Sequence, residues 1–172
     1  MNNMRSPIAQ LIYNAGQNLK DVSGAEIAPA LNESLNCFLG SSFRAVKGSV
    51  RDSQGGQTGV FDTVISAISP KPTNAEFPEF SADSTACVIA ASEMLNLEGF
   101  KAAYDRISKA KTLKKAPLVA KESNQQINAT MGIIFTIDSS VPVEMLTEEL
   151  GLLNTQTPSS PLKKGVFFAA GS

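Results

Sequence analysis

The strongest constraint on the fold is the apolar segment at residues 83–96, in which eight of fourteen residues are apolar. A segment that is apolar on all sides has to be buried against other elements from every direction. We interpret this segment as the central helix of the molecule, with Ser81 or Asp83 as its N-terminal cap. The remaining segments are then expected to pack around it.

Apolar residues also recur at helical spacing in several other parts of the chain, which predicts further helices. Pro142 suits the first turn of one of them, and Asn96 suits the N-cap of another. Pro29 sits early in a third segment and favours a helix start close to it. The predicted helices cover residues 7–19, 25–47, 60–68, 97–111, 118–128 and 142–150.

Two segments are candidates for strands. Residues 130–137 are rich in β-branched side chains, which favours a buried strand, although a helix remains an alternative. Residues 165–169 are a short apolar run that could pair with residues 132–137 or with a neighbouring subunit. Prolines at positions 70, 72 and 78 predict an extended connection between helices.

These segments together predict a mainly α fold. We expect a compact bundle of about five to seven helices, an extended Pro-rich connection, and a small β element that joins 130–137 to 165–169. A chain of 172 residues fits one domain of ordinary size. We place a single helical domain at residues 1–154 and a Pro/Ser-rich C-terminal tail or arm at 155–172.

The chain contains no histidine, which excludes Ser-His, Cys-His and His-metal mechanisms. Cys37 and Cys87 lack the C-x-x-C spacing of redox and metal sites. The glycine-rich stretch 55–59 is not followed by the Gly-Lys-Ser/Thr of a phosphate-binding loop. We therefore predict no catalytic, cofactor-binding or metal-binding residue, no cofactor, no small-molecule substrate, and a protein that is not an enzyme.

The sequence also lacks the hydrophobic signals of membrane insertion or export. No run of about eighteen apolar residues is present, so no membrane span is expected. Polar residues interrupt the first apolar stretch, at 8–19, so it does not resemble a secretion signal. These features predict a location in the cytoplasm or inside an assembled particle, with no membrane partner.

Charged residues are distributed in blocks of one sign. Residues 101–121 carry seven basic side chains and one acidic one, and both flanking regions are acidic. The segment could be a solvated face, a surface that contacts nucleic-acid phosphates, or a surface that contacts an acidic region of another subunit. The residues proposed for nucleic-acid or subunit contact are Lys101, Arg106, Lys109, Lys111, Lys114, Lys115 and Lys121.

This combination of features favours a non-enzymatic structural subunit that self-assembles as a homo-oligomer, of the coat, sheath or filament type. Its basic segment at 101–121 would contact nucleic acid, and its C-terminal arm would reach a neighbouring subunit. The alternative is an adaptor, chaperone or inhibitor that binds a partner protein through an apolar helical surface. The residues assigned to the assembly arm are Leu162, Val166, Phe167 and Phe168.

Overall fold

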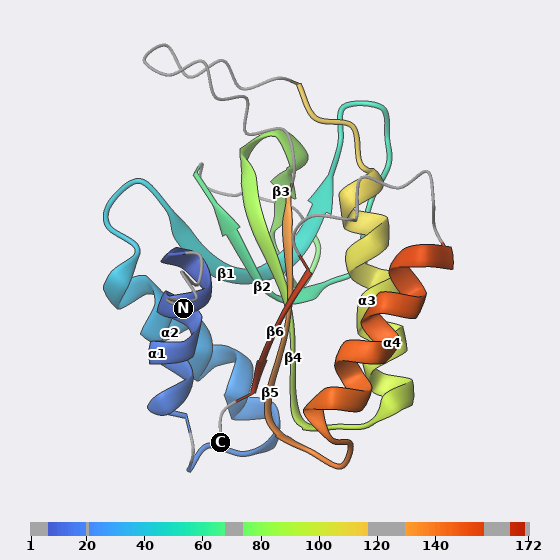
Figure 1. Ribbon diagram of the computed structural model, residues 1–172. Coiled ribbons are helices and arrows are strands. Elements are labelled where there is room, and N and C mark those ends of the chain that lie inside the picture. Colours follow the sequence, from blue (N-terminus) through green and yellow to red (C-terminus); the bar gives the residue numbers. More distant parts are fainter. Residues whose placement is uncertain (1–6, 20, 68–73, 117–129, 157–165, 171–172) are drawn as a thin grey trace.

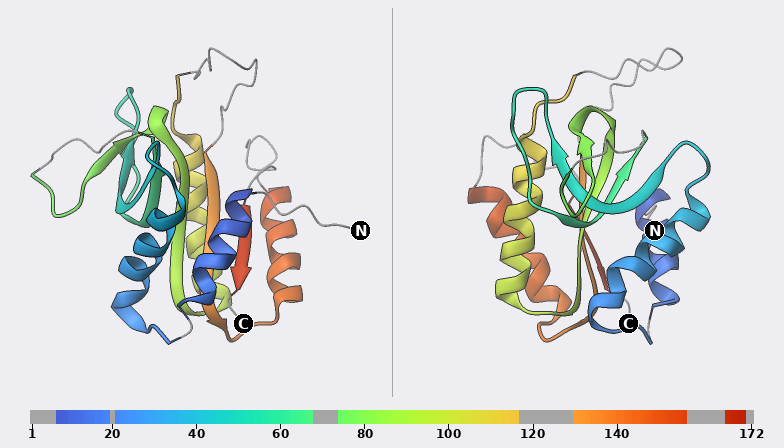
Figure 2. Two further views of the ribbon diagram at one scale, coloured as in Figure 1. Left: turned by 90° about the vertical axis from the view of Figure 1, so that its left-hand side faces the viewer. Right: turned by 180° about the vertical axis from the view of Figure 1, so that it is seen from behind.

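A mixed six-stranded sheet lies between two pairs of helices in the computed structural model of the chain (Figure 1). The structure describes residues 7–19, 21–67, 74–116, 130–156 and 166–170. The strands lie in the order β3-β1-β2-β4-β5-β6. Helices α1 and α2 cover one face of the sheet, and α3 and α4 cover the other (Figures 1 and 2). The fold is therefore a three-layered α/β arrangement.

The sheet combines antiparallel and parallel pairs. β2 pairs antiparallel with β1 and with β4, whereas β4 with β5, β5 with β6, and β1 with β3 are parallel. In this order β2 and β4 occupy the two middle positions of the sheet, and helices cover both faces (Figure 1). The strands are β1 (Arg44–Arg51), β2 (Phe61–Ser66), β3 (Glu79–Ser81), β4 (Thr85–Leu95), β5 (Met131–Ser139) and β6 (Val166–Ala170).

The parallel pairs require crossover connections, and helices supply two of them. α3 follows β4 directly, and α4 connects the end of β5 to the segment that leads to β6. Two short 3-10 turns, η1 (Gly24–Glu26) and η2 (Ala82–Ser84), precede α2 and β4. The helices are α1 (Pro7–Gln17), α2 (Ile27–Phe38), α3 (Leu97–Thr112) and α4 (Val143–Gln156).

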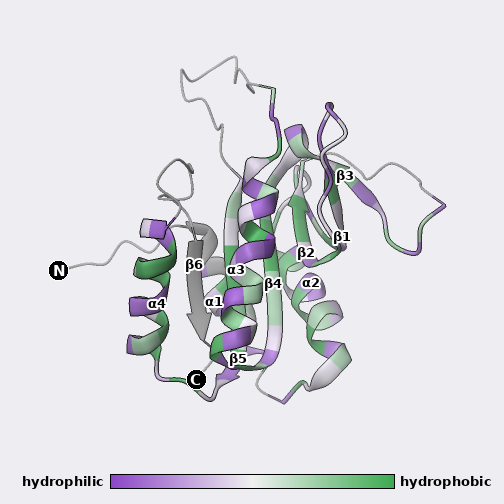
Figure 3. Cartoon of the chain, turned by 90° about the vertical axis from the view of Figure 1, so that its right-hand side faces the viewer, coloured by the Kyte–Doolittle hydropathy of each residue, from purple (hydrophilic) through white to green (hydrophobic). Residues whose placement is uncertain are grey.

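The sheet separates two hydrophobic cores. On the α1 and α2 side, Leu31 and Leu35 of α2 are fully buried together with Ile89 of β4. On the other side, Tyr104 and Ile107 of α3 pack over β4 and β5. Figure 3 shows β4 as hydrophobic along most of its length, whereas hydrophobic and hydrophilic residues alternate on α3. This contrast follows from position, since β4 is buried on both faces and α3 on only one.

The close approach of α3 to β5 depends on a glycine. A Cβ atom added to Gly132 of β5 would lie 2.1 Å from Cγ2 of Ile107. Because such a contact is far inside van der Waals distance, only glycine permits this packing.

The prediction of a mainly α bundle is wrong. The segment 83–96, interpreted above as the central helix, is the central strand β4. A strand buried on both faces reads as a nearly continuous apolar run, so alternation, the usual mark of a strand, is absent. The described part of the segment 60–68 likewise contains the strand β2, Phe61–Ser66, in place of the predicted helix. The predicted helix at 25–47 ends at Phe38, and the chain continues as β1.

Other predictions are confirmed. Helices form where residues 7–19, 97–111 and 142–150 predicted them, and the Asn96 side chain accepts a hydrogen bond from the N–H of Gly99 as the cap of α3. Residues 130–137 form β5, which pairs with β6 of the same chain. The predicted helix at 118–128 lies outside the described residues.

The boundary between a domain at 1–154 and a tail at 155–172 stays a prediction. The described part of the tail, β6, adds the sixth strand to the sheet beside β5. Within the described ranges, no helix has both the length and the apolar character needed to cross a membrane.

Candidate functional site

A β-bulge interrupts the pairing of β1 with β2 near the middle of the sheet. Val46 lies opposite Val64, but Gly48 lies opposite Phe61, so the register shifts between these pairs. Two residues of β2, Asp62 and Thr63, therefore face the single residue Lys47 of β1. An extra residue of this kind re-aims side chains, and such bulges are frequent beside active sites.

The bulge directs the carboxylate of Asp62 toward β4. The register of β2 with β4 runs from Ser66 to Thr63, which lies opposite Ile89. Beyond Thr63 the side chain of Asp62 replaces a backbone acceptor of β2. Its Oδ2 accepts a 2.8 Å hydrogen bond from the backbone N–H of Ala91. The carboxylate thus occupies the place where the two strands separate, and it satisfies a strand N–H that would otherwise need another acceptor.

Asn32 of α2 holds the bulge from the other side. Its Nδ2 donates a 3.0 Å hydrogen bond to the backbone oxygen of Asp62. Its Oδ1 accepts a 2.5 Å hydrogen bond from the hydroxyl of Thr63, a residue that is fully buried. One amide side chain therefore contacts both residues of the bulge.

A cleft of about 140 Å³ opens where β2 and β4 separate. Three charged side chains line it, each from a different strand: Lys47 from β1, Asp62 from β2 and Glu93 from β4. Oε2 of Glu93 accepts a 2.9 Å hydrogen bond from the N–H of Gly24, and Nζ of Lys47 lies 4.6 Å from the centre of the Phe77 ring. The other residues that line the cleft are Gly24, Ala25, Ile27, Ala28, Ala91 and Ser92.

Ser92 of β4 carries an unsatisfied polar group on the face of the strand opposite to Glu93, because successive strand residues point to opposite faces. Its Oγ atom is buried and has no hydrogen-bond partner among the residues that the structure describes. A buried hydroxyl without a partner is costly. We therefore assign this hydroxyl no role in the cleft.

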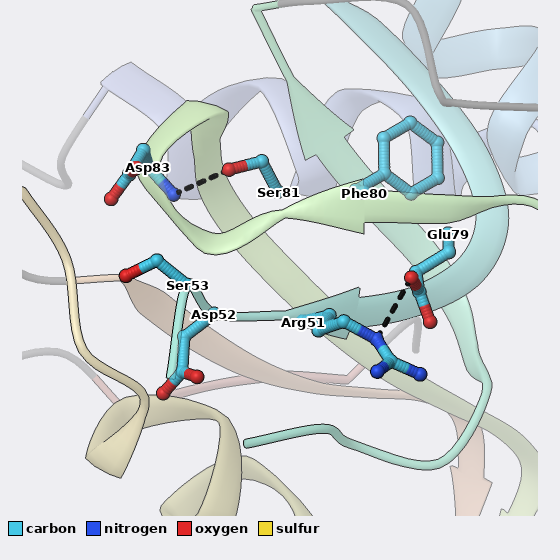
Figure 4. Close-up of a pocket in the computed structure, with 7 residues that line it drawn as sticks. All are labelled: Arg51, Asp52, Ser53, Glu79, Phe80, Ser81 and Asp83. Carbon is cyan, nitrogen blue, oxygen red and sulfur yellow. Dashed lines mark hydrogen bonds and ion pairs between the residues drawn. The ribbon is translucent and has the colours of Figure 1, made fainter. Parts of the chain in front are cut away.

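A second, larger pocket of about 290 Å³ lies at the far end of β1 (Figure 4). Its walls come from β1 and the following loop on one side, and from β3 and η2 on the other (Figure 4). Arg51 forms a 2.9 Å ion pair with Glu79, and the hydroxyl of Ser81 accepts a hydrogen bond from the N–H of Asp83 (Figure 4). The complete lining is Arg51, Asp52, Ser53, Glu79, Phe80, Ser81 and Asp83.

The carboxylates of this second pocket bind the backbone of residues 114–116. Asp52 accepts hydrogen bonds from the N–H groups of Lys114 and Gly56, and Asp83 accepts one from the N–H of Ala116. The hydrogen bond from Lys114 is the main cause that holds the pKa of Asp52 below its ordinary value. We assign the functional site to the smaller cleft, because it brings together Lys47, Asp62 and Glu93 from three strands beside the bulge.

The basic residues predicted to form one contact surface make different contacts in the structure. Lys101 forms a 3.3 Å ion pair with Glu149, and Lys115 donates a 2.6 Å hydrogen bond to the backbone oxygen of Thr85. The guanidinium of Arg106 donates to the backbone oxygen of Val60 and lies over the Phe61 ring.

The remaining basic residues differ in exposure. Lys111 and Lys115 are half-buried, and burial lowers the pKa of both ammonium groups. The side chains of Lys109 and Lys114 are exposed. Lys121 lies outside the described residues, as does Leu162 of the proposed arm. Of that arm, Val166, Phe167 and Phe168 pair through their backbone with β5. Contact of either group with nucleic acid or another subunit stays a prediction.

A metal site with three acidic or thiol ligands is absent from the described part of the chain, where no group of three or more His, Cys, Asp or Glu side chains is close enough. The cleft nevertheless offers two carboxylates, those of Asp62 and Glu93. Mg²⁺ is commonly held in proteins by one or two carboxylates, with waters and substrate phosphates completing its coordination. The donor set therefore suits Mg²⁺ or Mn²⁺, and it suits Zn²⁺ poorly.

Comparison with solved structures identifies the same fold in NucC. The chain superposes on NucC of P. aeruginosa in its cAAA-bound form with a TM-score of 0.59 and 15% identity, over 80% of this chain and 66% of that one. It superposes on cAAA-bound NucC of E. coli with a TM-score of 0.60 and 14% identity, over 96% of this chain and 76% of that one.

The apo form of E. coli NucC matches with a TM-score of 0.58 and 18% identity, over 78% of this chain and 64% of that one. This chain thus spans between about two thirds and three quarters of the NucC chains. No protein-family model matches the sequence, and no curated protein does. At these identities the likeness establishes the fold.

The likeness overturns the functional interpretation of the sequence. The chain has the α/β fold of NucC, a nuclease, so the prediction of a helical coat, sheath or filament subunit is wrong, and the adaptor alternative is not supported. The prediction that the chain is not an enzyme is wrong on the same ground. The exclusion of a small-molecule substrate is not supported either, because two of the similar structures contain cAAA.

Sequence reasoning missed the three charged residues of the cleft. Asp62, which lies near the start of β2, is not among the residues that the sequence analysis predicted for a site. An available signal was the position of Asp62 between a glycine-rich loop and an apolar run. Once residues 60–68 were interpreted as a helix, that position had no special meaning.

Proposed function

We propose that the chain is a metal-dependent phosphodiesterase that cleaves nucleic acid at the cleft between β2 and β4. The observation that carries the proposal is the convergence of Asp62, Glu93 and Lys47 on one cleft beside a bulged strand. The fold likeness to NucC supports it.

The side chains of the cleft have distinct roles in this proposal. Asp62 and Glu93 would hold a divalent cation. A divalent cation held there would supply positive charge that lowers the pKa of water and stabilises the charge developing on the phosphate. The ammonium of Lys47 binds a non-bridging phosphate oxygen as a point charge.

Two features prepare the site before a substrate arrives. The Asp62 carboxylate is fixed by the N–H of Ala91, so little rotamer freedom is lost when it binds a ligand. The Glu93 carboxylate is tied to the N–H of Gly24, a contact that a cation would have to replace or share. Attack of water on phosphorus would form a new P–O bond and break one P–O ester bond, while the water gives up a proton to solvent and the leaving oxygen takes one up.

The experiment that tests this proposal is a cleavage assay with purified protein. Plasmid DNA, single-stranded DNA and RNA are each incubated with Mg²⁺ or Mn²⁺, with and without added cAAA, because the similar NucC structures contain that ligand. Asp62→Asn and Glu93→Gln should abolish cleavage, whereas Glu148→Gln, which alters an exposed carboxylate on α4, should not.

Two results would overturn the proposal. One is the absence of cleavage of every nucleic acid by folded protein under all of these conditions. The other is cleavage that persists in Asp62→Asn at the wild-type rate, since a contaminating nuclease would then explain the activity. Loss of cleavage on addition of EDTA, restored by Mg²⁺, is the expected metal control.

We also propose that the exposed lysines of the segment 101–121 contact the phosphate backbone of the substrate. The side chains of Lys109 and Lys114 are exposed, unlike those of Lys111 and Lys115. Neutralisation of phosphates by lysines releases counterions, so binding should weaken steeply with salt. Lys109→Glu with Lys114→Glu should lower DNA affinity and reduce the salt dependence; unchanged binding would contradict this role.

Self-association is part of the same proposal, as the sequence predicted. Three large apolar side chains of α4 remain exposed in the single chain, namely those of Val143, Met145 and Leu152. Exposed apolar groups on one helix favour a contact with another subunit. Light scattering after size exclusion measures the mass, and a monomer at every concentration tested would contradict a homo-oligomer.

A further inference from the structure

We infer that Asn32 is a positioning residue for Asp62, and that it sets the divalent-cation affinity of the cleft through the β-bulge. This inference rests on the proposed function of the cleft. Asn32 belongs to α2 and does not line the cleft, so it acts through the residues that it contacts.

The bulge needs an external contact to keep its shape. The extra residue on β2 disturbs the regular ladder, so the backbone there has fewer strand partners than elsewhere. Asn32 supplies two of the missing contacts, a donor to the Asp62 backbone oxygen and an acceptor for the Thr63 hydroxyl. These two contacts lie on consecutive residues, and together they fix the orientation of the peptide between them.

The orientation of that peptide determines where the Asp62 carboxylate points. The backbone oxygen of Asp62 points to α2, and its side chain reaches Ala91 of β4. Without Asn32, the backbone oxygen would seek another donor, and the bulge could relax toward regular pairing. A one-residue slip of this kind turns a side chain to the other face of the sheet. The carboxylate would then leave the cleft.

Asn36, one turn further along α2, provides a matched control. Its side chain also binds the sheet twice, with Nδ2 donating 2.8 Å to the Ala45 oxygen and Oδ1 accepting 2.8 Å from the Ala45 N–H. Asn32 and Asn36 thus make the same kind of contact from the same helix. Of the two, only Asn32 contacts the bulged residues. If the role of Asn32 were purely structural, Asn32→Ala and Asn36→Ala would have equal effects on Mn²⁺ affinity.

The first readout is the affinity for Mn²⁺, measured by titration calorimetry on the full chain in its native oligomeric state. Asn32→Ala should weaken Mn²⁺ binding by about tenfold or more, the range found when groups that orient metal ligands are removed. Both Asn32→Ala and Asn36→Ala should lower the unfolding midpoint, and to a similar extent. Asn36→Ala should leave the Mn²⁺ affinity unchanged. Equal Mn²⁺ affinities for the two variants would overturn the inference, while cleavage by the wild type would still support the proposed function.

A second readout does not depend on metal binding at all. Native-state hydrogen exchange of the Ala91 amide reports its hydrogen bond to Asp62. Asn32→Ala should accelerate exchange at Ala91 more than Asn36→Ala does. If the wild type binds no Mn²⁺, the proposed function fails, and this exchange measurement alone decides the inference: equal rates in the two variants overturn it.

A variant at Thr63 covers the case in which Asn32→Ala does not fold. Thr63→Val keeps the shape of the side chain and removes the hydroxyl that donates to Asn32, so it should reproduce both effects in weaker form. Thr63→Ser keeps the hydroxyl, so its Mn²⁺ affinity should equal that of the wild type. Indistinguishable Mn²⁺ affinity and Ala91 exchange in Thr63→Val and Thr63→Ser would count against the inference.

Discussion

The carboxylate of Asp62 accepts a hydrogen bond from the backbone N–H of Ala91, 29 residues further along the chain, where β2 and β4 separate. A side chain here takes the place of the strand carbonyl that a regular ladder would supply. The same carboxylate lines the cleft, so one group satisfies the backbone and faces the proposed ligand. One side chain therefore has both a structural contact and the proposed role in ligand binding.

Substitutions at Asp62 should separate these two roles. Asp62→Asn keeps an oxygen that can accept from Ala91, so the urea midpoint should stay close to that of the wild type while cleavage is lost. Asp62→Ala leaves the Ala91 N–H without its partner and should cost about 1–3 kcal/mol of unfolding free energy in addition. Urea denaturation and the cleavage assay measure the two effects. Equal stability of the two variants would show that the hydrogen bond contributes nothing.

Substitution of two glycines by alanine should change the unfolding free energy in opposite directions. Gly132→Ala would place a Cβ atom 2.1 Å from Ile107, so α3 must shift away from β5, at a cost of about 1–3 kcal/mol. Gly151 lies inside α4 with no atom near its added Cβ, and alanine there should stabilise by about 1 kcal/mol through helix propensity. Thermal unfolding of the two variants gives both signs. Destabilisation by Gly151→Ala would mean that the described end of α4 is not helical in solution.

The helices on the outside of the molecule could be predicted from the sequence, and the central strands could not. α3 is buried on one face, so Phe100, Tyr104 and Ile107 recur at helical spacing and Asn96 marks its start. Cys87 and Val88 of β4 point to opposite faces of the sheet, yet both are completely buried. Burial on both faces removes the alternation that distinguishes a strand from a buried helix.

Predicting the cleft from the sequence was harder still. Asp62 and Glu93 are thirty-one positions apart, and they meet only because β2 and β4 are neighbours in the sheet. The bulge that aims Asp62 depends on the register of β1 with β2, which follows from tertiary pairing and not from a local motif. The absence of histidine excluded several mechanisms but left carboxylate chemistry open.

The lowered pKa of Asp52 predicts a stability difference that depends on pH. Its carboxylate is held charged mainly by the N–H of Lys114 and further by those of Gly56 and Gln54. A group whose pKa is lower in the folded state stabilises the fold above its unfolded pKa, and this contribution disappears as pH falls through the folded pKa. Asp52→Asn should therefore have a lower urea midpoint than the wild type at neutral pH.

The difference in urea midpoint between Asp52→Asn and the wild type should become smaller once the pH falls below 3.8, the ordinary pKa of the Asp carboxyl. Urea midpoints of both proteins, measured from neutral pH down to the lowest pH at which the wild type is folded, test this sign. A gap that widens on acidification would contradict the assignment of Asp52 as the tether of residues 114–116.

The two cysteines predict different thiol reactivities. Cys87 lies in the central strand, where burial raises the pKa of its thiol to about 12, and the more distant charge of Lys111 opposes this only in part. Cys37 is exposed at the end of α2. Because the thiolate is the reactive form, Ellman's reagent should label one thiol per native chain and two after denaturation. Cys37→Ser should abolish the native reaction, whereas equal and rapid labelling of both thiols in the wild type would contradict the burial of β4 between the two helical layers.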